Sequence, residues 1–207
     1  MIAAKPKLKI LAGANRREHV VLPEELEKYL AAATEPLRSV ATVLVDSGLR
    51  HEECFLLRWE NVMWQAGKFG GMQVQHGKSA AARRAVPMPP HVRGILAARW
   101  QAAGQPEVGY VWPAAKASLG HIVPNSIYEP HRHAIKESGV RPFVLYSLRH
   151  PFLTRLGATG VDAWTLARIA GVMAASRFRR TACTRRTFTA PWMDWWPGAR
   201  LATGREN

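Results

Sequence analysis

Cysteine, acidic residues and long apolar runs are all scarce in this sequence. Only two cysteines, Cys54 and Cys183, occur among 207 residues. That is too few for a disulfide scaffold or a cysteine-based metal site, so we expect a reducing, cytoplasmic compartment and no metal site. No apolar run approaches the roughly 20 residues that span a bilayer, so we expect no membrane partner. Residues 1–9 alternate lysine with small apolar residues but lack the apolar core and cleavage pattern of a secretory signal.

The shortage of acidic residues leaves a strongly basic chain. The 15 Asp and Glu residues oppose 29 Lys and Arg residues, which gives a net charge of +14. Such an excess favours a polyanionic partner, nucleic acid first, and a basic protein without a nucleic-acid partner is the alternative. The apolar content of 47% is ordinary for a globular protein and argues against general disorder.

Apolar residues at helical spacing predict a mainly helical chain. Proline and acidic residues open a helix at Pro23, and Gly48 is placed to end the second helix in a left-handed turn. The predicted helices cover residues 23–30, 36–46, 51–59, 91–103, 125–138, 149–157 and 161–170, the last ending at Gly171.

Between the third and fourth predicted helices the apolar pattern changes to period two. Residues 72–75 and 85–88 bracket the sequence His76-Gly77-Lys78-Ser79, which predicts an antiparallel β-hairpin with a flexible tip. The expected fold class is therefore α+β, mainly α, with a small antiparallel β-sheet.

Three basic residues stand at marked positions in this pattern. Arg50 and Arg149 each lie at the start of a predicted helix, and Lys78 lies at the hairpin tip between them. A guanidinium group stays charged and can bind two oxygen atoms at once. Two arginines from distant helices, with a lysine on a hairpin, can therefore clamp one phosphate of a nucleic-acid backbone.

Four short segments together resemble one family. The chain is similar over residues 18–171 to the catalytic domain of the tyrosine recombinase (phage integrase) family, with the segments in the family's order and spacing. These are Gly48 to Glu53 followed by Leu57-Arg58-Trp59, His76-Gly77-Lys78, Leu148 to Phe152, and Leu166 to Gly171. Residues 1–17 are then a basic arm or linker, and the family's separate N-terminal core-binding domain is expected to be absent.

The resemblance implies a reaction and a role for each residue. Family members bind double-stranded DNA, assemble on it as oligomers, and break and rejoin a strand through a 3′-phosphotyrosyl intermediate without a cofactor. Arg50 and Arg149 would stabilise the charge that develops on the phosphate oxygens, and Lys78 would protonate the leaving 5′-oxygen. Glu53 would orient Arg50, and His150 would support the second arginine.

Simpler interpretations of the same residues stay open. Arg50 and Arg149 are alternatively surface arginines at helix ends, and Lys78 is alternatively a solvated turn lysine. Glu53 is equally a plain surface acid, and His150 equally a packing residue.

The sequence departs from the family pattern at three positions. Tyr146 stands where the family has histidine, and it is a poor proton carrier near neutral pH. Val172 stands where the family has histidine or tryptophan, and it offers a phosphate no hydrogen bond. The family's nucleophilic tyrosine is expected near Thr181, but no tyrosine follows Arg149. We therefore find no nucleophile and expect impaired cleavage.

Residues 172–207 form a divergent tail, with seven arginines and no lysine. A frameshift near Val172 is one hypothesis for this break, because a one-base shift there yields codons similar to the family's His-Gly-Ser-Ile segment. A histidine also returns near Cys183, but a tyrosine returns only one position early, from Arg180-Thr181. The nucleotide sequence that encodes residues 172–207 would decide whether a frameshift has occurred.

The leading interpretation is the catalytic domain of a site-specific DNA recombinase or integrase, with impaired cleavage. The first alternative is a catalytically inactive DNA-binding remnant of an integrase. The second is a basic RNA-binding or scaffold protein with chance motif matches, which predicts that Arg50, Lys78 and Arg149 lie far apart.

Overall fold

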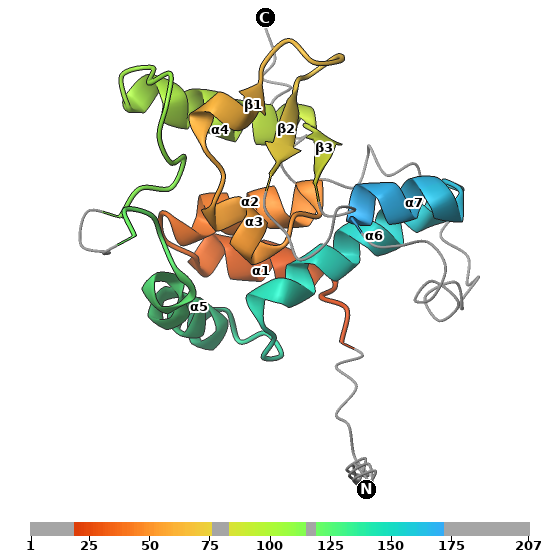
Figure 1. The fold of residues 1–207 in the computed structure, drawn as a ribbon. Coiled ribbons are helices and arrows are strands. Elements are labelled where there is room, and N and C mark those ends of the chain that lie inside the picture. Colours follow the sequence, from red (N-terminus) through yellow and green to blue (C-terminus); the bar gives the residue numbers. More distant parts are fainter. Residues whose placement is uncertain (1–18, 76–82, 115–118, 172–207) are drawn as a thin grey trace, which may run out of the picture.

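The computed structural model describes residues 19–75, 83–114 and 119–171. Helices dominate this part of the chain (Figure 1), and the predicted α+β, mainly α fold class is confirmed. The helices are α1 Pro23–Ala32, α2 Leu37–Ser47, α3 His51–Phe55, α4 Pro90–Ala102, α5 Pro124–Ser138, α6 Arg149–Ala158 and α7 Ala163–Ala170. The short 3₁₀ turns η1 Trp59–Asn61 and η3 Leu145–Leu148 lie before β1 and before α6. Among the described residues, no helix combines the length and apolar character needed to cross a membrane.

A small antiparallel sheet with the order β1-β2-β3 stands beside the helices. Strands β2 Gly71–Val74 and β3 Arg84–Pro87 are the predicted hairpin, with Met72 opposite Val86 and Val74 opposite Arg84. The third strand, β1 Val62–Met63, was not predicted, because two residues are too few to show a period. The hairpin tip, residues 76–82 with Lys78, lies outside the described residues.

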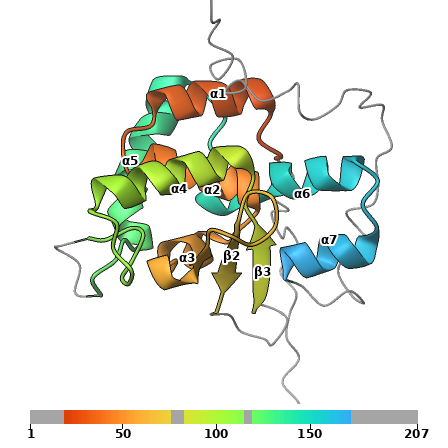
Figure 2. The same ribbon diagram turned by 90° about the horizontal axis from the view of Figure 1, so that it is seen from above.

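Helix α2 is the centre of the fold, and its middle, residues 40–45, is buried on every side. Its residues Val40, Val43, Leu44 and Val45 are at most 1% exposed, and α1, α4, α5 and α6 pack against it (Figures 1 and 2). Each such side chain contributes about 1.5–3 kcal/mol by leaving water. The third helix is shorter than predicted, because it ends at Phe55 and the chain turns through η1 into β1.

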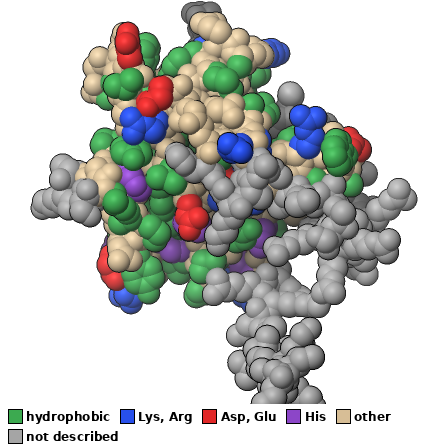
Figure 3. Space-filling view, viewed as in Figure 1, with side chains coloured by type: hydrophobic (Ala, Val, Ile, Leu, Met, Phe, Trp, Pro, Cys, Tyr) green, Lys and Arg blue, Asp and Glu red, His purple; other side chains and the backbone are tan. Residues whose placement is uncertain are grey.

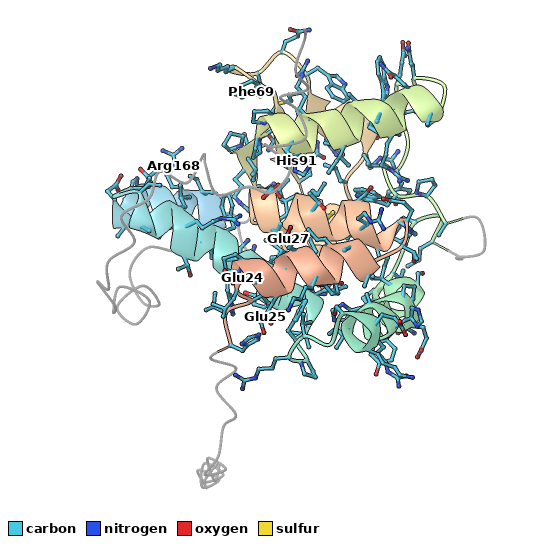
Figure 4. The ribbon with its side chains drawn as sticks, turned by 180° about the vertical axis from the view of Figure 1, so that it is seen from behind. Glu24, Glu25, Glu27, Phe69, His91 and Arg168 are labelled. Carbon is cyan, nitrogen blue, oxygen red and sulfur yellow. The ribbon has the colours of Figure 1, made fainter. Side chains whose placement is uncertain are left out.

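Asp46 near the end of α2 ties two other helices to this core. His91 Nδ1 of α4 lies 2.9 Å from Asp46 Oδ2, and Arg155 Nη2 of α6 lies 3.5 Å from Asp46 Oδ1. Figure 4 labels His91 where α4 faces α2. One carboxylate thus links α2, α4 and α6.

Gly48 ends α2 in the predicted left-handed turn, with φ +66°. The position is also closed to any side chain, because a Cβ atom there would lie 2.2 Å from Cδ1 of Phe152 on α6. Helix α6 therefore packs directly on the turn that leads into α3. This contact brings the starts of α3 and α6 close together, and these starts carry Arg50 and Arg149.

Candidate functional site: an arginine cluster at the end of α7

Arg50 lies at the start of α3 and is held by the carboxylate of Glu53. The backbone N–H of Arg50 donates to Glu53 Oε2 at 2.9 Å, and Arg50 Nη1 donates to Glu53 Oε1 at 2.6 Å. The glutamate therefore satisfies an otherwise unpaired amide at the helix start and also orients the guanidinium. The Arg50 side chain remains 27% exposed, whereas that of Glu53 is only 5% exposed. Glu53 is thus a buried acid, and the surface-acid interpretation is wrong.

A third arginine, Arg84 at the start of β3, holds the other side of Glu53. Its Nη1 and Nη2 donate to Glu53 Oε1 and Oε2, each at 2.9 Å. Burial alone would raise the pKa of Glu53, but the hydrogen bonds and charge of Arg84, together with the hydrogen bonds from Arg50, outweigh burial and lower the pKa. The carboxylate is therefore ionised at neutral pH.

Sequence reasoning missed Arg84, although the sequence carries one signal for it. Strand side chains alternate between two faces, so Arg84 shares a face with Val86 and Met88, which are 1% and 3% exposed. The side chain of Arg84 is accordingly only 7% exposed. A charged residue on the core face of a strand requires a partner of opposite charge.

Arg149 is the most deeply buried of the three arginines, at 2% exposure. Its Nη1 donates to the carbonyl of Gly48, and its Nη2 donates to the carbonyl of Ala170. Burial, followed by the charge of Arg50, lowers the pKa of Arg149 to about 10. Arg149 therefore still carries its charge at neutral pH.

The C-terminal end of α7 collects all three guanidinium groups. Ile169 O accepts from Arg84 Nε at 2.7 Å, Ala170 O accepts from Arg149, and Gly171 O accepts from Arg50 Nη2 at 3.1 Å. The last carbonyls of a helix have no partner within it and carry partial negative charge, so they suit cations.

Gly171 itself has φ +59°, and a Cβ atom there would lie 2.7 Å from Arg84 Nη1. Only glycine fits this close approach without displacing the arginine.

The cluster combines three positive charges with one carboxylate, so it has an excess of positive charge. Its members come from α3, β3 and α6, which are far apart in the sequence. Over the face seen in Figure 3, by contrast, basic and acidic side chains are interspersed. Fixed guanidinium groups are suited to binding phosphate or carboxylate oxygens, with Arg50 the most exposed of the three.

Tyr146, the residue in the predicted histidine position, lies in η3 and is 43% exposed. Its ring packs edge to face with His150 at 5.6 Å and with His51 at 6.5 Å between ring centroids. Burial, and then the charge of Arg149, lowers the pKa of His150, so this histidine is neutral at pH 7. The structure thus places His150 against Tyr146.

An open groove of about 1020 Å³ begins beside Tyr146 and His51 and runs along α5. Its lining includes neither Arg50 nor Arg149, so the groove is separate from the arginine cluster.

Within residues 19–75, 83–114 and 119–171, no group of three or more His, Cys, Asp or Glu side chains could hold a metal ion.

The structure brings together Arg50, Glu53 and Arg149 of the predicted site and adds Arg84. The predicted residues Lys78 and Val172, and the expected nucleophile position at Thr181 with neighbouring Cys183, lie outside the described residues. The roles predicted for all of these residues stay predictions.

Comparisons with known proteins agree with this fold. The integrase of Salmonella phage P22 is 22% identical over 189 residues, which cover 88% of this chain and 48% of that protein. The XerA recombinase crystal structure matches 84% of this chain and 59% of its own, with a TM-score of 0.63 and 21% identity. The XerH recombinase bound to its difH substrate matches 72% of this chain and 46% of its own, with a TM-score of 0.57 and 20% identity.

The fold is therefore that of the tyrosine recombinase catalytic domain. A family model described as the Phage integrase family matches residues 19–176, and the chain belongs to this family. The predicted resemblance is confirmed. The chain spans about half the length of the curated relative it matches.

Proposed function

We propose that residues 18–171 are the catalytic domain of a site-specific DNA recombinase, flanked by a basic arm, residues 1–17, and a divergent tail, residues 172–207. In this proposal Arg50 and Arg149 clamp one phosphate of double-stranded DNA, and several copies assemble on the DNA. The convergence of Arg50, Glu53 and Arg149 at the end of α7 is the observation that carries the proposal. Chance motif matches in a basic scaffold or RNA-binding protein would not bring these residues together.

The chemistry of the clamp follows from its charges. A phosphodiester carries one negative charge, and strand cleavage adds negative charge to its non-bridging oxygens. Fixed guanidinium groups stabilise that added charge without having to reorient, which is the usual basis of electrostatic catalysis. Tyr146, which is 43% exposed and precedes Arg149 by three residues, is able to donate one further hydrogen bond to a phosphate oxygen.

We further propose that this chain binds DNA but cleaves it poorly or not at all. The family reaction needs a tyrosine nucleophile after the second arginine, and no tyrosine follows Arg149. Of the four tyrosines, Tyr29 is fully buried and Tyr146 occupies the family's histidine position. A second protomer of the same sequence has no later tyrosine to contribute either.

Two measurements on the full chain test the proposal. In the first, duplex DNA affinity is measured against salt for the native chain, for R50A, and for R168A as control. Arg168 is exposed on α7 (Figure 4), so both variants lose one charge but only R50A loses a clamp residue. We expect R50A to bind at least about tenfold more weakly than R168A, because a hydrogen bond to a charged group contributes about 1.5–3 kcal/mol. Equal affinities of R50A and R168A would contradict the clamp.

The second measurement concerns cleavage. A pool of nicked suicide duplexes of randomised sequence traps any covalent protein–DNA adduct, because the cleaved strand cannot be rejoined. We expect salt-sensitive binding without an adduct. A covalent adduct would contradict impaired cleavage and would show that this chain has another nucleophile.

A further inference from the structure

Among the three arginines of the cluster, Arg84 donates the most side-chain hydrogen bonds. It donates hydrogen bonds to both carboxylate oxygens of Glu53 and to the carbonyl of Ile169. Its guanidinium also packs against the backbone of Gly171. It therefore joins three separate parts of the site: the start of α3, the base of the hairpin and the end of α7. Arg84 also lies on the same hairpin as Lys78, at the point where the described strand begins.

The charge balance explains why a second guanidinium is needed on Glu53. Arg50 and Glu53 alone would be a neutral ion pair, which attracts a phosphate weakly. Arg84 compensates the charge of Glu53, so that the group of three keeps one net positive charge. The positive charge of Arg50 is thus left to act on an anion.

The hydrogen-bond geometry of Glu53 also indicates that a second guanidinium is needed. Each oxygen of Glu53 accepts two hydrogen bonds, one from Arg84 and one from Arg50. Without Arg84 the buried carboxylate would lose half of these bonds and its fixed orientation. The rotamer of Arg50 depends on that orientation, because Arg50 Nη1 is bound to Glu53 Oε1.

We propose that Arg84 is a positioning residue of the phosphate clamp, which acts through Glu53 to hold Arg50 ready for a DNA phosphate; this inference rests on the function proposed above. Arg84 itself need not touch the DNA, since its side chain is only 7% exposed and both Nη atoms of its guanidinium donate to Glu53.

The test uses two charge-conserving variants of adjacent residues in the full chain. R84K keeps the positive charge but removes the planar fork, whereas R83K makes the same change at the exposed neighbour Arg83. We expect R84K to bind duplex DNA about tenfold or more weakly than R83K. Equal affinities of the two variants would overturn the proposal.

A double-mutant cycle with E53Q identifies the route of the effect. If Arg84 acts through Glu53, R84K should have little further effect in the E53Q background, and additive losses would overturn the proposal. NMR titration of the Glu53 carboxylate distinguishes a role through Glu53 from a merely structural role of Arg84. R84K should raise the pKa of Glu53, and R83K should not. An unchanged Glu53 titration in R84K would also overturn it.

R50A and R168A are measured in the same series. If R50A binds as well as R168A, the proposed clamp itself fails. If R50A is weak but R84K matches R83K, only the role of Arg84 fails. The thermal unfolding curve of each variant is measured first. The binding experiments are then run at a temperature at which all variants are folded.

Discussion

Replacing Gly48 by alanine tests the contact that brings the two clamp arginines together. Gly48 has φ +66°, and the added Cβ atom would lie 2.2 Å from Phe152 Cδ1 and 2.6 Å from Cε1. The aromatic ring belongs to α6, the helix that begins at Arg149. Alanine at this position therefore has to adopt a left-handed backbone and also push α6 away from the end of α2.

The two costs have different physical origins and can be measured separately. An L-residue in the left-handed conformation costs about 1–2 kcal/mol. Displacing a packed ring costs about 1–3 kcal/mol more. G48A should therefore destabilise the chain by about 2–5 kcal/mol. G139A is the matched control, because Gly139 ends α5 with φ +65° and no atom lies within 4 Å of its added Cβ.

Urea denaturation of both variants gives the free energies of unfolding. We expect G139A to lose about 1–2 kcal/mol, the backbone cost alone, and G48A to lose clearly more. G48A should also weaken DNA binding, since the Gly48 carbonyl accepts a hydrogen bond from Arg149. If the two variants lose the same stability, the packing of α6 on Gly48 is not a constraint and the reasoning fails.

Two further predictions concern buried polar groups. The pKa of Glu53 is lowered in the folded chain, so its stabilising contribution is complete above the ordinary value of about 4.5 and is lost as pH falls through the folded value. The thermal midpoint of unfolding of E53Q should fall less steeply with decreasing pH in that acid range than the midpoint of the native chain. Parallel curves for the two proteins would refute this. The buried hydroxyl of Tyr29 lies 2.7 Å from Nδ1 of His131, whose Nε2 donates to Phe143 O. Y29F should cost about 1–3 kcal/mol in urea denaturation by leaving Nδ1 unpaired, whereas Y128F, at a 56% exposed site, should cost almost nothing.

Local chemistry made much of the fold predictable from the sequence. Glycine after an apolar helical stretch predicts a left-handed helix end, and Gly48 and Gly171 both adopt it, with φ +66° and +59°. Period-two apolar residues predicted β2 and β3, because a strand with one buried face alternates. Strand β1 escaped prediction, since its pairing of Val62 with Met72 is fixed by the sheet and not by any local pattern.

The candidate site was predictable only where a residue stands in a distinctive local context. Arg50 and Arg149 could be singled out because each lies at the start of a helix in a segment similar to a known family. Arg84 has one weaker local signal, its place on the core face of a strand, but its partners Glu53 and Ile169 are brought to it only by the tertiary fold. The burial of Glu53 could not be read locally either, since a glutamate near a helix start is ordinarily exposed.

NMR observation of arginine side-chain Nε–H signals during titration with inorganic phosphate tests the clamp most directly. This probe needs no knowledge of the DNA target sequence. The account predicts that the signals of Arg50 and Arg149 shift together along one saturable curve, that the signal of exposed Arg168 does not follow it, and that R50A abolishes the saturation. Equal, unsaturable shifts of Arg50, Arg149 and Arg168 would show that these guanidinium groups form no phosphate site, and would contradict the account.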